Sequence, residues 1–434
     1  MESTIKKLWN RNFSLVTLCH AVAMLGNMAL SAALAFYVRD ITGSESMFGL
    51  ALSAPYISML MMSPLGGIMA DRLKKQRIML WIDISVVVII LLFLAANGLF
   101  SAALPLAFVK LLALNAVQGV YMSTTAAAVP TVVPTEKLQP ANALITVINA
   151  LIGASGQALA AVLYGNFGLL PILIPFAILY GFVAIMDLFI RIPYKIQKSN
   201  LSVTQIIKSD MSQAIKFVSK DKPILIKLAV ISFFVFATIV SLLVIGLPIL
   251  ITDTLNMNLS MVGIGQMSMA IGGLVGGITA GALGARLTIS RVSKLLMVYS
   301  FLPIPVGLLI LFNAPAIVIF VALTVICVLV MFVLTLIVIT AITYVQIETT
   351  QELLGKVLAL FSMLPFLAQA VGAFAFGVLF DIVSSSPYIV VFAATLISTI
   401  VAIYAHKSLR NMPPCLSRKN LVTEKTVNIQ QQKT

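Results

Sequence analysis

The fold is decided by the segment Gly66-Gly67-Ile68-Met69-Ala70-Asp71-Arg72-Leu73-Lys74-Lys75-Gln76-Arg77, which sets one acid and four cations between two long apolar runs. So dense a charge cluster cannot lie in hydrocarbon, so the chain leaves a membrane here. The excess of positive charge predicts that it leaves on the cytoplasmic side. Gly67 and Ala70 allow helices to approach closely just before this exit.

The same pattern returns later in the chain. Gly281, Arg286 and Arg291 follow Gly67, Arg72 and Arg77 by 214 positions each, and Ala285 stands where the first copy has Asp71. A second matched pair, Gly156 and Gly372, is 216 positions apart. An internal repeat of this length is typical of transporters built from two similar halves.

Composition indicates a membrane protein. Hydrophobic residues make up 60% of the chain and charged residues 10%, whereas a soluble globular protein carries about 25% charged residues. One helical span needs roughly 20 apolar residues. The apolar runs predict an all-α membrane protein with twelve transmembrane helices, at residues 13–38, 46–70, 78–97, 102–128, 141–164, 169–190, 224–251, 259–284, 292–312, 315–345, 355–380 and 387–406.

The polar segments divide the predicted spans into two halves. We expect a six-helix half at 1–191, a cytoplasmic linker at 192–222, a second six-helix half at 223–407 and a cytoplasmic tail at 408–434. The linker is rich in lysine, and residues 203–218 have the periodicity of an amphipathic surface helix. Of 28 Lys and Arg residues, only Arg39 and Lys110 fall away from the predicted cytoplasmic side. This topology and contact with anionic lipid explain the net charge of +14 without nucleic acid.

The opening segment resembles the loop motif of the major facilitator superfamily, G-x-L-A-D-R-x-G-R-K, with Lys74 in place of the second glycine. The resemblance extends over nearly the whole chain. Residues 10–13, 40–44 and 353–357 are similar to the branch that contains macrolide-efflux proteins and enterobactin exporters. The resemblance implies a gating motif made of Gly67, Asp71, Arg72, Lys75, Arg77, Gly281, Arg286 and Arg291.

The resemblance to this family implies that spans one, four, seven and ten line a central cavity. Span one carries His20, Met24, Asn27 and Ser31 on one helical face. The candidate cavity residues are His20, Asn27, Lys110, Asn115, Gln118, Thr324 and Met331. His20 alone has two interpretations, a proton carrier or a packed histidine.

Three ionisable residues have alternative roles. The resemblance implies that Asp71 holds its loop against the start of span eleven; otherwise it only ends a span. Asp83 is a candidate coupling residue or a local partner for Arg72 or Arg77. Lys110 lies deep in span four, and we expect it to face the cavity and take part in cargo binding or coupling, unless the span begins later and leaves it at the outer interface.

Two segments depart from proton-driven drug exporters of the family. Residues 115–119, Asn-Ala-Val-Gln-Gly, lack the arginine of the exporter pattern R-x-x-Q-G. Residues 156–161 lack the proline of G-P-x-x-G-G. Gly156 and Gly372 remain as predicted helix-packing positions, with or without a role in transport.

The sequence indicates a transporter and no enzyme, cofactor or metal site. It has no zinc-ligand cluster and no glycine-rich nucleotide loop, and Cys19, Cys327 and Cys415 are too few and scattered for a disulfide framework. The resemblance implies a monomeric efflux antiporter of the plasma membrane, with both termini cytoplasmic, that exports an amphiphilic drug or macrolide in exchange for protons. The alternatives are a secondary transporter for an endogenous metabolite or siderophore-like anion, and a sensor or scaffold that transports nothing.

Overall fold

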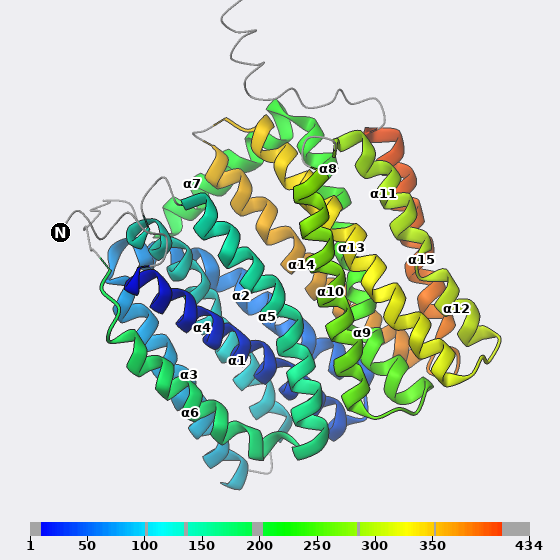
Figure 1. The fold of residues 1–434 in the computed structure, drawn as a ribbon, viewed down its shortest axis with the longest axis horizontal. Helices are drawn as coiled ribbons and strands as arrows, with labels where there is room; N and C mark the ends of the chain where they lie inside the picture. The colour runs from blue at the N-terminus through cyan, green and yellow to red at the C-terminus, as the bar shows by residue number, and fades with distance from the viewer. Residues whose placement is uncertain are drawn as a thin grey trace, which may run out of the picture.

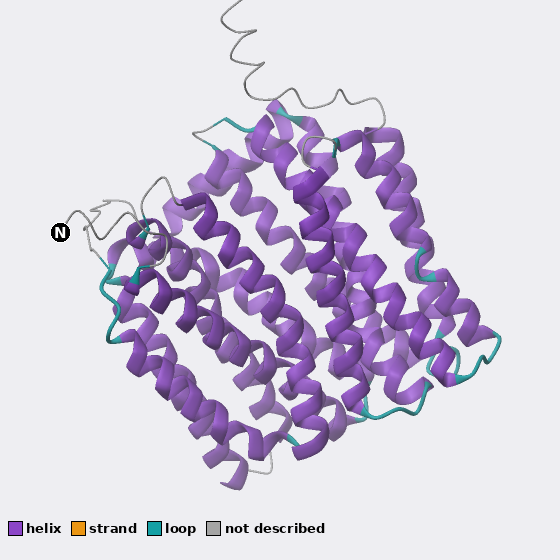
Figure 2. Cartoon of the chain, viewed as in Figure 1, coloured by secondary structure: helices purple, strands orange, loops and turns teal. Residues whose placement is uncertain are grey.

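The computed structural model describes residues 10–99, 103–133, 138–192, 203–283, 287–350 and 353–409. Within these ranges the chain is helical and contains no strand, as Figure 2 shows. The predicted all-α class is therefore confirmed. For some residues inside the helices, Asp71 among them, the structure describes the backbone and not the side chain. Arg286 and the tail beyond residue 409 are outside the described residues altogether.

Six helices make up the first half: α1 (Arg11–Thr42), α2 (Glu45–Arg72), α3 (Lys75–Leu99), α4 (Ala103–Val132), α5 (Leu138–Phe167) and α6 (Leu169–Asp187). A linker follows, with α7 (Val203–Lys216) and a π-helical turn, η3 (Phe217–Asp221). The predicted surface helix at 203–218 therefore forms, and its last apolar residues Phe217 and Val218 are buried.

The second half begins with one long helical unit made of α8 (Pro223–Val235), η4 (Phe236–Val240), α9 (Ser241–Ile249) and η5 (Leu250–Thr254). It continues with α10 (Leu259–Leu283), α11 (Ile289–Phe301), α12 (Ile304–Leu311), α13 (Ala316–Glu348), α14 (Leu354–Ile382) and α15 (Tyr388–Leu409). The predicted span at 292–312 is two helices, because Pro303 cannot donate the backbone hydrogen bond that would continue α11.

Local chemistry fixes the turn between α1 and α2. Gly43 ends α1 in the left-handed region, with φ 62°, and its N–H donates to Arg39 O at 2.8 Å. Ser44 then caps α2, because its hydroxyl accepts a hydrogen bond from Met47 N at 3.3 Å. Two residues therefore reverse the chain and place the ends of α1 and α2 side by side.

The helices cross the molecule in one direction, with α1–α6 on one side of the view and α8–α15 on the other (Figure 1). We call the end that holds the start of α1, the end of α2 and α7 the linker end. The end that holds Arg39, Asp253 and Asp381 is the far end. Along the seam between the halves, α2 packs against α14 and α5 packs against α10.

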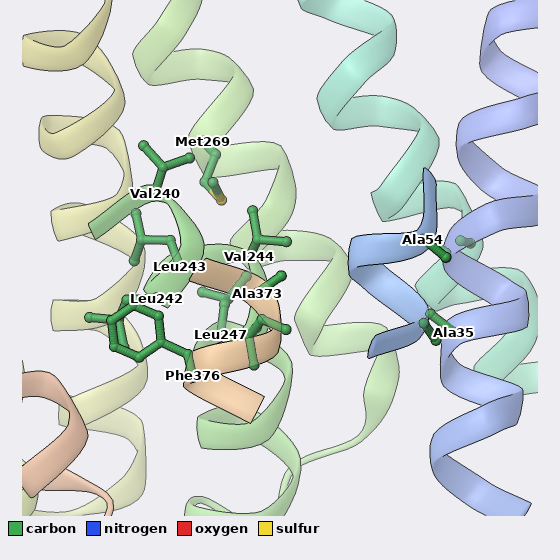
Figure 3. Packing of buried hydrophobic residues seen from close by; sticks show 14 of the residues in the cluster. Ala35, Ala54, Val240, Leu242, Leu243, Val244, Leu247, Met269, Ala373 and Phe376 are labelled. Carbon is green, nitrogen blue, oxygen red and sulfur yellow. The ribbon is translucent and has the colours of Figure 1, made fainter. Parts of the chain in front are cut away.

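The core of the second half forms around α9, all of whose residues are buried. Leu243 and Leu247 of α9 converge with Met269 of α10 and Phe376 of α14 (Figure 3). On the outside of the bundle, large apolar side chains are exposed, among them Trp81, Leu92, Ile178, Ile278 and Leu396. Ten helices of the described chain are long and apolar enough to cross a membrane. Exposed apolar surface on such helices is suited to lipid contact.

Candidate functional site

Arg39 joins the two halves at the far end. It lies in the last turn of α1, and its side chain is 11% exposed. Its Nε donates to Glu45 Oε1 at 2.8 Å within the first half. Its Nη1 donates to Thr252 Oγ1 at 2.9 Å and its Nη2 to Asp253 Oδ2 at 2.5 Å, both in η5 of the second half. The planar guanidinium has enough donors to hold all three partners at once.

A carboxylate from the second half caps a helix of the first half. Asp381, in the last turn of α14, accepts hydrogen bonds at 2.8 Å from the backbone N–H groups of Glu45 and Ser46. The hydroxyl of Ser44 also donates to it, at 2.9 Å. These are the unsatisfied amides of the first turn of α2, where the positive end of the helix dipole favours an anion.

Glycines bring the backbones of the two halves together at the same end. A Cβ added to Gly49 of α2 would lie 2.6 Å from Ala373 O, and one added to Gly377 of α14 would lie 2.6 Å from Glu45 O. In the neighbouring helix pair, a Cβ added to Gly263 of α10 would lie 3.1 Å from Ala158 O of α5. The far end is thus closed by backbone packing as well as by charge.

Gly156 and Gly372 lie at helix crossings within the halves. A Cβ on Gly156 of α5 would come within 2.6 Å of Met28 Cβ on α1. A Cβ on Gly372 of α14 would come within 2.4 Å of Ala237 O in η4. The two glycines hold corresponding positions, since each packs against the first long helical unit of its half.

The motif at the linker end is only partly described. Arg72 is the last residue of α2, Lys75 is the first of α3, and Arg77 lies in the first turn of α3. Gly281 lies in the last turn of α10, and Arg291 in the first turn of α11. The side chain of Asp71 and all of Arg286 lie outside the described residues, so the gating role of this motif remains a prediction.

The polar residues of span one are engaged inside the first half. His20 Nε2 lies 2.8 Å from Asn149 Oδ1 of α5, and its ring stacks on Tyr121 of α4 with centroids 6.0 Å apart. Asn27 Nδ2 donates to Leu114 O at 3.2 Å, and Asn115 Nδ2 donates to Ser31 Oγ at 2.9 Å. The contacts of Asn27, Asn115 and Ser31 form a buried polar seam between α1 and α4.

The other candidate cavity residues lie in different surroundings. Gln118 is buried on α4, and its Nε2 has no hydrogen-bond partner among the described residues. Lys110 is 2% exposed, and its Nζ lies 4.2 Å from the ring centroid of Phe93 on α3. The ammonium thus points toward α3, and a role for it in the cavity remains a prediction. On α13, Thr324 and Met331 are half-buried.

Asp83 and Asp187 lie together in the interior of the first half. Both residues are 0% exposed. Asp187 is buried at the end of α6 and faces Asp83 of α3. This pairing could not be read from the sequence, because the two acids are far apart along the chain. The sequence shows only that each of the two acids lies inside an apolar helix, near the linker end of that helix.

Two bundles of apolar helices, related by an internal repeat and meeting along α2–α14 and α5–α10, define a multi-pass membrane protein of the secondary-transporter class. Residues 16–373 match the Major Facilitator Superfamily, and the chain belongs to that family. It is a transporter and not an enzyme, as its sequence predicts. No curated protein sequence matches the chain.

Solved transporters share the fold at low sequence identity. A D-xylose-proton symporter has a TM-score of 0.69 and 12% identity, with 93% of this chain and 99% of that one covered. A bacterial homologue of the human lysosomal transporter Spinster, inward-facing and occupied, has a TM-score of 0.69 and 12% identity, with 94% and 98% covered. The nucleoside transporter NupG has a TM-score of 0.66 and 15% identity, with 91% and 99% covered. These likenesses establish the fold alone.

Proposed function

We propose that this chain exports an amphiphilic small molecule of the antibiotic type in exchange for protons, by alternating access. The observation that supports alternating access is the closed far end, where Arg39 and Asp381 join the halves. A carrier of this kind keeps one end closed while its cargo exchanges at the other, and the halves rock around a site between them. Contacts that close an end must also be able to part, and those of Arg39 and Asp381 are polar.

The distribution of charge supports an orientation in the plasma membrane. The linker end carries Lys74, Lys75 and Arg77 after α2, and Lys216, Lys220 and Lys222 around η3. The far end carries the acids Asp40, Asp253 and Asp381. By the positive-inside rule the linker end, with both termini, is cytoplasmic. In this orientation the halves 1–191 and 223–407 are joined by a cytoplasmic linker, and the tail 408–434 is also cytoplasmic.

The loop motif acts as the second gate in this proposal. When the cytoplasmic side closes, Asp71 at the end of α2 would approach the N-terminus of α14, as Asp381 at the end of α14 approaches that of α2. A carboxylate at a helix N-terminus gains about 0.3–1 kcal/mol. Two gates of similar strength would keep the two closed states close in free energy, which favours turnover.

The cargo class rests on the resemblance to the macrolide-efflux branch and on the apolar character of the helices. Met331 and Thr324 on α13 are half-buried, and we assign them to the cargo surface because thioether side chains adapt to varied apolar shapes. The fold does not identify the cargo, since the similar structures include a D-xylose-proton symporter, a nucleoside transporter and a bacterial metal transporter. A transporter of an endogenous metabolite or anion is the second candidate.

The proposal is tested with purified protein in proteoliposomes, with radiolabelled erythromycin and ethidium as probes. We expect accumulation of a probe when a pH gradient is imposed in the exporting direction, and loss of accumulation when a protonophore collapses the gradient. Asp71→Asn should abolish accumulation at normal expression. Probe movement that is equal with and without the pH gradient would contradict proton exchange. The absence of movement for both probes, with and without a gradient, would contradict drug export.

A further inference from the structure

The acids Asp83 and Asp187 form a buried pair at the junction of α1, α3 and α6. Asp83 lies eight residues into α3, and Asp187 is the last residue of α6. Both are 0% exposed, and their carboxyl groups are within hydrogen-bonding range of each other. Cys19 of α1 is also buried and interacts electrostatically with both acids. Three helices of one half thus bring titratable groups to one point.

The described residues place no hydrogen-bonded cation on this pair. None of the four carboxyl oxygens has a conventional hydrogen-bond donor among the described residues. The titratable groups that face the pair are Cys19 of α1, Tyr121 of α4 and Tyr180 of α6. Tyr180 does not donate a hydrogen bond to the pair, because its hydroxyl donates to Ala23 O at 2.6 Å.

Tyr121 is a further buried polar group near the two acids. Its side chain is 0% exposed, its hydroxyl has no hydrogen-bond partner among the described residues, and it interacts electrostatically with both acids and with Cys19. A buried hydroxyl without a partner costs free energy, which the packing of this half must offset. The same residue stacks on His20, which extends the group toward the polar seam of α1 and α4.

Electrostatics fixes the charge of the pair. Two ionised carboxylates in contact repel each other, and burial penalises each charge further. One proton removes both problems, because a carboxylic acid can donate a hydrogen bond to a neighbouring carboxylate. A pair that holds one shared proton while the site is closed to water therefore avoids both costs.

The position of the pair gives it access to one compartment. Eight residues of helix separate Asp83 from the start of α3, and Cys19 from the start of α1, which is ~12 Å at 1.5 Å per residue. Gln76 Nε2 donates to the carbonyl oxygens of Asp187 and Leu188 at 3.1 Å and anchors the end of α6 over the site. A small separation of α6 from α3 would admit water from the linker end.

We propose that Asp83 and Asp187 share one exchangeable proton and form the site at which this transporter takes up and releases protons on its linker side. The inference rests on the proposed proton exchange and names the residues that carry it. Loss of the proton leaves two facing charges that push α3 and α6 apart beside Cys19 of α1. Proton exchange thereby changes the packing of α1, a helix that also carries Arg39 of the far end.

The first test is independent of transport. Infrared spectra of the purified protein in light and heavy water should show a protonated carboxyl band that shifts on deuteration and disappears as pH rises. We expect Asp83→Asn and Asp187→Asn each to remove the band, and Glu348→Gln, which removes an acid ion-paired with Lys222, to leave it unchanged. A band that is absent, or that persists in both variants, overturns the shared proton. A band that does not change with pH or exchange overturns its release.

The second test separates coupling from folding, with labelled erythromycin as the probe. Asp83→Asn and Asp187→Asn should lose accumulation driven by a pH gradient, while exchange of labelled for unlabelled probe continues. Asp187→Glu should recover part of the accumulation, because it restores a titratable group. Gradient-driven accumulation at the wild-type level in either Asn variant overturns the proposal. If the wild-type protein moves no probe, the proposed function fails and the infrared result still decides whether the pair holds an exchangeable proton.

Discussion

Asp381 Oδ1 accepts a hydrogen bond from the backbone N–H of Glu45 at 2.8 Å, so the last turn of α14 caps the first turn of α2 across the two halves of the molecule. The contact is local and exposed, and it uses backbone amides that any sequence would provide at a helix start. It can therefore part without leaving a buried charge. The side chain of Arg39, by contrast, is only 11% exposed, and that of its partner Glu45 is 14% exposed.

Replacement of Asp381 by asparagine should weaken the closed far end. The charge interaction with an exposed helix N-terminus contributes about 0.3–1 kcal/mol, so we expect about a two- to fivefold shift toward the open far end. Spin labels at Phe167→Cys and Ile382→Cys, both exposed and on different halves, would report the shift as a longer distance population. Cys415 is replaced by serine in this background, while the buried Cys19 and Cys327 remain. An unchanged distance distribution would argue against the cap.

Arg39→Gln should have a larger effect, because it leaves Glu45, 14% exposed, without its charged partner. Hydrogen bonds to charged groups contribute about 1.5–3 kcal/mol each, so thermal unfolding in detergent should occur at a clearly lower temperature. The double variant Arg39→Gln/Glu45→Gln should recover part of that loss, because the unpaired acid is gone. Strictly additive effects of the two substitutions would contradict a direct coupling between these residues.

Gly156→Ala should destabilise the first half, whereas Gly153→Ala on the same helix should not. The added methyl at Gly156 would lie 2.6 Å from Met28 Cβ, and overpacking of this kind costs about 1–3 kcal/mol. Nothing lies within 4 Å of the corresponding point at Gly153, and alanine is favoured over glycine in helices by about 1 kcal/mol. Thermal unfolding of the two variants checks this, and equal midpoints would contradict the close crossing of α1 and α5.

Lys110→Met should raise the thermal stability of the protein. A cation deep in a membrane helix costs about 2.5–3.5 kcal/mol, and contact with the Phe93 ring returns about 0.5–2 kcal/mol. The unfavourable term is the larger, so an apolar side chain of similar length should fit this site better. Lys407→Met on exposed α15 serves as the control and should leave the unfolding midpoint unchanged. A lower midpoint for Lys110→Met would indicate an anionic partner for this cation.

The sequence predicts the fold well, because bilayer thickness sets span length and charge marks the loops. The predicted span 46–70 corresponds to α2, Glu45–Arg72, and the span 355–380 to α14, Leu354–Ile382. The break at Pro303 was predictable from proline chemistry but lies inside an otherwise continuous apolar run. The partners of the site could not be predicted, because the pairs Asp83–Asp187, His20–Asn149 and Arg39–Asp253 join helices far apart in the chain.

Alternating access requires the contact between Asp381 and the start of α2 to break in every cycle. The most direct test is a disulfide between Ser44→Cys and Asp381→Cys, since the native side chains touch at 2.9 Å, in a background with Cys415→Ser. Each single-cysteine variant, treated with the same oxidant, controls for loss of the native side chain. Our account predicts that the oxidised double variant stops moving labelled erythromycin in proteoliposomes and recovers when a reductant is added. Transport by the fully cross-linked protein at the rate of its reduced form would contradict it.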